Sequence, residues 1–121
     1  MTPTGASACC VKGSTWFTAL GHCPGKSPET CSVDTLLRLQ MEFRDVYFLF
    51  IDELSLLGTG DLSDIDKKLR MVVLSDARKL MLLAGYNTIL SGDGYQLFPV
   101  MKQSLLARSI AENTPNATFT Q

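Results

Sequence analysis

The stretch VYFLFIDELSLLG, residues 46–58, begins with six apolar residues and then reaches two adjacent acids, Asp52 and Glu53. A continuous apolar run of this length predicts a buried strand over residues 46–51. Because polar alternation is lacking, the run is typical of a parallel α/β sheet in which the strand is covered on both faces. In open parallel sheets ligands bind beyond the carboxyl ends of the strands. The sequence therefore places both acids at a potential binding edge.

The segments around this strand alternate between helical and extended patterns. Apolar residues at helical spacing predict one helix over residues 32–43 and another over residues 58–74. In the second helix, Ser63 with Asp66 is a candidate cap. A second short strand is expected at residues 86–91. This order predicts an α/β domain with a mostly parallel sheet flanked by helices.

The composition is that of one small globular domain. The chain has 121 residues, of which 45% are hydrophobic and 19% charged, and its net charge is −1. Without a strong overall charge, any contact with nucleic acid must be local. The charged residues of the second helix, Lys68 among them, are expected to be solvated. No secretory signal and no bilayer-spanning apolar run is visible, so we expect an intracellular protein that does not bind membranes.

The cysteines offer a metal site as the weakest functional alternative. No Cys-x-x-Cys pair occurs, and His22 is the sole histidine. Adjacent cysteines point in divergent directions, which disfavours a shared four-ligand cage. Reduced structural thiols are therefore the preferred interpretation of Cys9, Cys10, Cys23 and Cys31.

An apolar strand followed by Asp-Glu is the pattern of a Walker B motif. Asp52 is suited to orient a magnesium ion, which neutralises charge on bound phosphates. Glu53 is suited to polarise the water that attacks a terminal phosphate. The alternative is a strand-to-helix turn that carries two solvated acids, and this motif alone does not decide between them.

A second polar strand end follows in TILSGDGYQLFPV, residues 88–100. The spacing from Asp52 to Asp93 leaves room for a crossover helix and a return strand, so both strand ends can share one site. Gln96 follows, and its amide can donate to a phosphate oxygen while accepting from the attacking water. An ordinary Gly-Asp-Gly turn is the alternative interpretation of this segment.

Together these segments resemble the PIF-type superfamily 1 DNA helicases, including the helicase modules of Helitron transposons. FLFIDELSLLG (48–58), LSDIDKKLRMV (62–72) and NTILSGDGYQLFPV (87–100) resemble motif II, the helix after it and motif III. TPTGASACCVKGST (2–15) is similar to motif Ia, Ala-Pro-Thr-Gly-x-Ala-Ala followed by Gly-x-Thr-x-His. The resemblance covers most of the chain and implies an incomplete RecA-like P-loop NTPase domain.

The resemblance implies roles for individual residues. Asp52 would bind magnesium and Glu53 would activate the water, while both would line the nucleotide site. Gln96 would act in catalysis by sensing the terminal phosphate, with Asp93 also in the nucleotide site. Motif Ia would contact single-stranded or forked DNA through short polar groups and backbone amides, which grip phosphates without net positive charge. Its DNA-binding residues would be Pro3, Thr4, Gly5 and Thr15.

Some positions depart from the family pattern. Phe17 replaces the histidine of motif Ia, which puts that DNA or packing contact in doubt. Gly94 and Phe98 replace a phenylalanine and a proline of motif III. These replacements are expected to loosen the loop that presents Gln96.

The sequence contains no Gly-x-x-x-x-Gly-Lys-Ser/Thr loop, the Walker A motif. Residues 25–27, Gly-Lys-Ser, come nearest, but Gly21 is one position too close and Pro28 blocks the helix that should cradle phosphate. We therefore expect the P-loop segment to lie upstream in a longer reading frame and the second motor domain to be absent. Without the P-loop strand, the strand at residues 46–51 is expected to have an open apolar edge.

The leading hypothesis is part of an ATP-dependent DNA helicase that uses magnesium and ATP. Residues 1–113 form the partial motor domain, and residues 114–121 form a polar tail whose composition is compatible with disorder. The resemblance implies 5′-to-3′ unwinding, roles in DNA repair, recombination and telomere maintenance, and a nuclear or mitochondrial location. The isolated chain is expected to be inactive because Walker A is lacking.

Other functions stay open at this point. The first is a catalytically inactive remnant of a helicase or transposon that acts, if at all, as a binding module. The second is a RecD-type nuclease subunit, which shares motifs II and III. The helix LSDIDKKLR at residues 62–70 favours the PIF-type branch over the RecD type.

Overall fold

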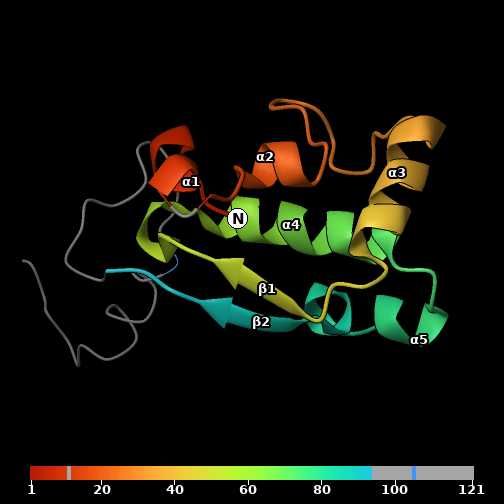
Figure 1. Cartoon of the computed structure of the whole chain (residues 1–121). Helices are drawn as coiled ribbons and strands as arrows, with labels where there is room; N and C mark the ends of the chain where they lie inside the picture. The colour runs from red at the N-terminus through yellow and green to blue at the C-terminus, as the bar shows by residue number, and fades with distance from the viewer. Residues whose placement is uncertain (11, 94–104, 106–121) are drawn as a thin grey trace, which may run out of the picture.

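The structure is a computed structural model that describes residues 1–10, 12–93 and 105, and its core is a small parallel sheet (Figure 1). Strands β1 (Phe48–Ile51) and β2 (Asn87–Leu90) pair in parallel, with Phe50 opposite Ile89. Both strands therefore end at the same edge of the sheet. The expected α/β class with a parallel sheet is confirmed.

The helices gather on one side of the sheet, above it in the view of Figure 1. A short helix, α5, and two turns of 3-10 helix, η1 and η2, lie in the connections around the strands. The bounds are α1 (Gly5–Cys10), α2 (Trp16–Ala19), α3 (Val33–Phe43), α4 (Thr59–Val72), α5 (Asp76–Lys79), η1 (Leu54–Leu56) and η2 (Leu82–Gly85).

Local hydrogen bonds fix where the two long helices begin. Ser32 caps α3, because its Oγ accepts the backbone N–H of Thr35 at 3.2 Å. At α4 the carboxylate of Asp61 accepts the N–H of Gly58 at 2.9 Å. The predicted Ser63–Asp66 cap is wrong, because both residues lie inside a helix that starts four positions before the expected cap.

The main core lies between the helices and the inner face of the sheet. Ile65 and Leu69 of α4 are fully buried, as the helical spacing predicts. Lys68, expected to be solvated, is 1% exposed, and its Nζ donates to the carbonyl of Thr30 at 3.2 Å. This bond fixes the loop before α3 onto α4. Buried side chains from every layer complete the cluster, including Trp16, Leu20, Leu39, Phe43, Ile51, Leu57, Val72 and Tyr86.

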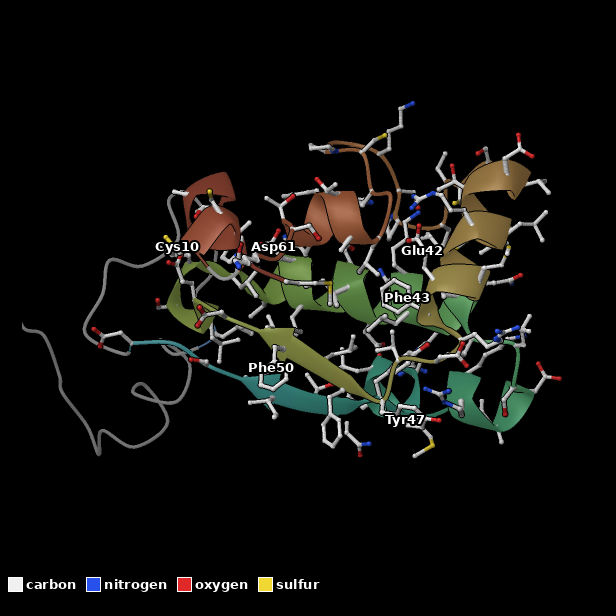
Figure 2. The ribbon with its side chains drawn as sticks, viewed as in Figure 1. Cys10, Glu42, Phe43, Tyr47, Phe50 and Asp61 are labelled. Atoms are coloured by element: carbon white, nitrogen blue, oxygen red, sulfur yellow. The ribbon has the colours of Figure 1, made fainter. Side chains whose placement is uncertain are left out.

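The outer face of the sheet is largely uncovered. Leu49 points toward the helices and is 6% exposed, whereas its neighbours Phe48 and Phe50 are 60% and 59% exposed. On β2, Ile89 is 44% exposed on this same outer face. Figure 2 shows the Phe50 ring on the outer side of β1, away from α4. The prediction of a strand covered on both faces is wrong, because the described helices α1 to α4 pack on one face.

An apolar hollow of about 790 Å³ lies along β1 and is lined by residues of both faces of the strand, Leu49 and Ile51 of the inner face among them. Its lining includes Phe43, Phe48, Phe50 and Ile89, and it reaches Asp52 at the carboxyl end of β1. Large apolar surfaces of this kind are unusual on a monomeric protein.

Both edges of β1 are paired near its carboxyl end, so the expected open edge is not found there. One edge pairs with β2. On the other edge the amino group of Met1 donates to the carbonyl of Phe50 at 2.5 Å, and the N–H of Asp52 donates to the carbonyl of Met1 at 3.0 Å. The bonds of Met1 do not extend to Phe48 and Leu49. Within the described residues the sheet has two strands, so the edge of β1 at these two residues is open, as expected, and so is the outer edge of β2.

None of the helices that the structure describes is both long and apolar enough to cross a membrane. The tail at residues 114–121 and the part of motif III after Asp93 lie outside the described residues.

The uncovered face predicts a poorly soluble or marginally stable isolated chain. Phe50→Ser should raise the soluble yield and reduce the fluorescence of the dye ANS, while changing the free energy of unfolding by only about 0.5 kcal/mol. Leu49→Ser is the matched control on the buried face, and it should cost at least the roughly 2–5 kcal/mol of a buried leucine truncation. A wild-type monomer that melts cooperatively at high temperature and binds no ANS would contradict this prediction.

Candidate functional site

The ends of β1 and β2 are joined by backbone hydrogen bonds. The N–H of Ser91 donates to the carbonyl of Ile51 at 2.9 Å, and the N–H of Leu54 donates to the carbonyl of Ser91 at 2.9 Å. The turn after β2 therefore lies directly against the acidic pair that follows β1. The two strand ends meet at one place, as the sequence predicts.

Glu53 occupies an unusual backbone conformation at this place. Its φ is 55° and its ψ is 47°, in the left-handed region, which a residue with a Cβ rarely adopts. Such a conformation costs on the order of 1–3 kcal/mol and persists only where the surroundings fix it. Here the next residue, Leu54, is held by its bond to Ser91. The conformation turns the chain sharply out of β1 and directs it into η1.

Asp52 is half-buried at the carboxyl end of β1 and lines the apolar hollow along this strand. Its neighbour across the sheet edge is the amino group of Met1. Burial lowers the pKa of this amino group, and the negative charge of Asp52 partly opposes the shift. Asp52 therefore supplies negative charge at the strand end.

The proposed DNA-contacting residues of motif Ia lie beside this strand end. Thr2 and Thr15 form a parallel bridge, in which the N–H of Trp16 donates to the carbonyl of Thr2 at 3.0 Å. This bridge brings Thr15 next to the Pro3-Thr4-Gly5 turn. Thr15 also caps α2, because its Oγ1 accepts the N–H of Thr18 at 3.3 Å.

Thr4 has a structural role in the turn before α1. Its Oγ1 accepts the N–H of Ser7 at 3.3 Å, and its carbonyl accepts the N–H of Ala8 at 3.2 Å. These bonds start the helix. Pro3 and Thr4 are half-buried, while Gly5 is exposed.

A side-chain contact that sequence reasoning missed connects motif Ia to the acidic pair. Ser7 Oγ donates to Oε1 of Glu53 at 2.5 Å, across 46 positions of sequence. Figure 1 shows α1, which carries Ser7, above the carboxyl ends of the strands. The Thr4-x-x-Ser7 spacing of a helix cap was the available signal, but it reveals nothing about contact with Glu53.

No family model and no curated protein matches the sequence. Solved structures do match. Pif1 helicase from Bacteroides in complex with ADP-AlF3 and ssDNA aligns with a TM-score of 0.65 and 30% identity, covering 92% of this chain and 25% of that chain. The match supports a Pif1-type helicase fragment.

Two further Pif1 structures give the same result. Unliganded Pif1 from Bacteroides sp aligns with a TM-score of 0.64 and 28% identity, over 95% of this chain and 26% of that chain. A structure that shows DNA unwinding at forked dsDNA by two coordinating Pif1 helicases aligns with a TM-score of 0.62 and 30% identity. The alignment covers 92% of this chain and 26% of that chain. The chain thus spans about a quarter of the length of these proteins. Its α/β sheet is of the RecA-like helicase type.

The remaining site residues are only partly placed. Asp93 is exposed and follows the turn that packs on Leu54. Gln96 lies outside the described residues, so its position beside the acids stays a prediction. The Gly-Lys-Ser sequence at residues 25–27 lies in turns, and the next helix begins only at Val33.

The described residues contain no group of three His, Cys, Asp or Glu side chains close enough to hold a metal ion. The cysteines are free thiols; Cys9, Cys10 and Cys23 are exposed and Cys31 is half-buried. A magnesium ion that binds one or two carboxylates together with nucleotide phosphates and water does not need such a group.

Gly92 tests the close packing of the two strand ends. A Cβ added at Gly92 would lie 2.7 Å from the backbone nitrogen of Leu54, which cannot move without breaking its bond to Ser91. Gly92→Ala should therefore reduce the free energy of unfolding by about 1–3 kcal/mol in urea titrations.

Gly60→Ala is the matched control for Gly92→Ala. A Cβ at Gly60 meets nothing within 4 Å, and the residue lies in the first turn of α4. This variant should be neutral or more stable by up to about 1 kcal/mol, because alanine favours helices over glycine. Equal stability of the two variants would contradict the packing described here.

Proposed function

We propose that this chain supplies the magnesium-binding and water-activating part of an ATP-driven DNA helicase motor. The observation that carries the proposal is the joined pair of strand ends. Asp52 and Glu53 lie against the Ser91-Gly92 turn, and Ser7 connects them to motif Ia. This arrangement, the motif resemblance and the match to Pif1 helicases all support the same motor.

Asp52 is the residue that would hold magnesium. Its half-buried carboxylate stands at the end of a rigid strand and offers oxygen ligands, which this hard cation prefers. When bound, magnesium neutralises charge on the nucleotide phosphates. Asp52 would fix the position of the ion, because β1 is paired on both sides where it ends.

Glu53 would orient and polarise the attacking water. General-base assistance of this kind is worth about 10²–10⁴ in rate. The hydrogen bonds at Leu54 and Ser7 hold the backbone and carboxylate of Glu53. Asp93 and Gln96 would belong to the same nucleotide site, with Gln96 sensing the terminal phosphate.

Motif Ia would supply the contact with single-stranded or forked DNA. Pro3 and Thr4 precede α1, Gly5 is the first residue of this helix, and Thr15 lies beside them through the bridge to Thr2. Backbone amides and hydroxyl groups at a turn can hold phosphates without net positive charge, which suits a chain of net charge −1.

The finer parts of the proposal rest on the motif resemblance. They are 5′-to-3′ unwinding, roles in DNA repair, recombination and telomere maintenance, and a nuclear or mitochondrial location. The complete motor would also need a Walker A segment and a second motor domain.

One observation favours a second candidate, a catalytically inactive helicase remnant that acts as a binding module. Phe17, Gly94 and Phe98 replace residues of the family motifs. A protein partner bound tightly without dependence on nucleotide or DNA would favour this candidate over the motor.

The isolated chain should hydrolyse no ATP above background, because the loop that cradles the phosphates is lacking. Phosphate release should be equal for the wild type and for Glu53→Gln. Measurable hydrolysis by the pure wild-type chain that is lost in Glu53→Gln would show that the chain is active by itself.

The chain should bind oligo(dT), and Thr4→Ala should weaken this binding about tenfold or more, because a hydrogen bond to a charged phosphate is worth about 1.5–3 kcal/mol. Fluorescence anisotropy with a labelled oligonucleotide measures the effect. Thr30→Ala, which changes an exposed threonine on the loop before α3, is the control and should bind normally. No binding by the wild type, or equal binding by both variants, would count against motif Ia as the DNA contact.

A further inference from the structure

We propose that Ser7 is a positioning residue that couples the DNA-contacting turn of motif Ia to the carboxylate of Glu53. The inference rests on the proposed function, which assigns DNA contact to Thr4 and water activation to Glu53. It goes beyond that function by naming the side chain through which the two sites communicate.

The first observation is a continuous chain of side-chain contacts. Thr4 Oγ1 and Ser7 Oγ are 2.7 Å apart, and Ser7 Oγ is 2.5 Å from Oε1 of Glu53. All three residues are half-buried, which limits the competition from water. The predicted DNA contact and the predicted water-activating acid are thus separated by a single hydroxyl group.

The number of protons that the Thr4 and Ser7 hydroxyl groups can donate fixes the direction of each hydrogen bond in this series of contacts. Ser7 has one hydroxyl proton, and it is donated to the Glu53 carboxylate. Ser7 Oγ must then accept from the hydroxyl of Thr4, while Thr4 Oγ1 accepts the backbone N–H of Ser7. Every proton of the network has one acceptor, so the Thr4 hydroxyl proton cannot move to a new acceptor without a change at Ser7.

The second observation is the position of Ser7 in the motif. In the pattern Ala-Pro-Thr-Gly-x-Ala-Ala, Ser7 stands where the pattern has alanine. Alanine has no hydroxyl group to donate, so the contact with Glu53 is a feature of this chain's own residue. Ser7→Ala therefore gives α1 the residue that the motif pattern itself has at this position.

The third observation is the strained backbone of Glu53. Its left-handed conformation is fixed by the Leu54–Ser91 bond on one side, and its carboxylate is held by Ser7 on the other. A small displacement of Ser7 therefore acts on a residue that has little freedom to adjust elsewhere. The position of the carboxylate should follow the position of the hydroxyl.

These contacts predict how DNA would be sensed. A phosphate bound at the turn would compete with Ser7 for the Thr4 hydroxyl proton, because charged acceptors form the stronger hydrogen bonds. Without the hydrogen bond from Thr4, the Ser7 hydroxyl that holds Glu53 would change its orientation. The carboxylate of Glu53 should therefore occupy different positions in the DNA-free and DNA-bound chain.

The first experiment needs no DNA and uses the full chain. The side-chain carboxyl ¹³C resonance of Glu53 is recorded for the wild type, Ser7→Ala, Ser7→Thr and Ser63→Ala. The resonance should shift in Ser7→Ala, return toward the wild-type position in Ser7→Thr, and stay unchanged in Ser63→Ala. Ser63 is an exposed serine of α4 and controls for the loss of a helical hydroxyl.

Ser7→Cys serves if Ser7→Ala does not fold, because it keeps the size of the side chain and weakens the donor. It should shift the same resonance. An unchanged Glu53 resonance in the folded Ser7 variants would overturn the positioning role, whatever the chain does with DNA.

The second experiment adds oligo(dT). In the wild type, the Glu53 resonance should move together with the amide signals of the motif Ia turn. In Ser7→Ala, the turn signals should still move, while the response of Glu53 is lost. A Glu53 response that survives in Ser7→Ala would overturn the coupling and leave the proposed function intact.

Absence of oligo(dT) binding by the wild type would overturn both the proposed DNA contact and the coupling. The first experiment would then still decide whether Ser7 positions Glu53. The two failures are therefore distinguishable.

Discussion

The parallel pairing of β1 with β2, closed at its end by the bonds of Ser91 to Ile51 and Leu54, is the constraint on which the site depends. It fixes Leu54, and with it the left-handed backbone of Glu53. It also leaves no room for a Cβ at Gly92. If these bonds were lost, Asp52 and Glu53 would stand on a free loop, and no shared site with the residues after β2 would exist.

The described helices cover only one face of the sheet around this constraint. Parallel sheets are normally covered on both faces. Here the described helices pack on the face of Leu49, while Phe48, Phe50 and Ile89 are exposed on the other face. The chain spans about a quarter of the matched Pif1 structures. The apolar run of β1 is thus suited to a deeper burial than the described residues provide.

The link between motif Ia and motif II depends on one hydroxyl group. Hydroxyl–carboxylate contacts are short and strong when the surroundings exclude water. The contact of Ser7 with Glu53 is 2.5 Å long and lies between two half-buried side chains, and Thr4 contacts Ser7 from the other side. In the proposed motor, the two motifs are therefore in direct contact within this segment, although motif III and its Gln96 are the parts to which the family resemblance assigns the sensing of nucleotide.

The sequence by itself determined the two strands, the two long helices and the place of the acids. The apolar run before Asp52, the helical spacing around Ile65 and the polar turn after Leu90 are local patterns, and local patterns fix secondary structure and strand ends. Only the tertiary structure decided the uncovered face of β1, the burial of Lys68 and the contact of Ser7 with Glu53. These features depend on which distant segments meet. Because the periodicity of one segment says nothing about the side chains that another segment brings to it, no local pattern could have predicted them.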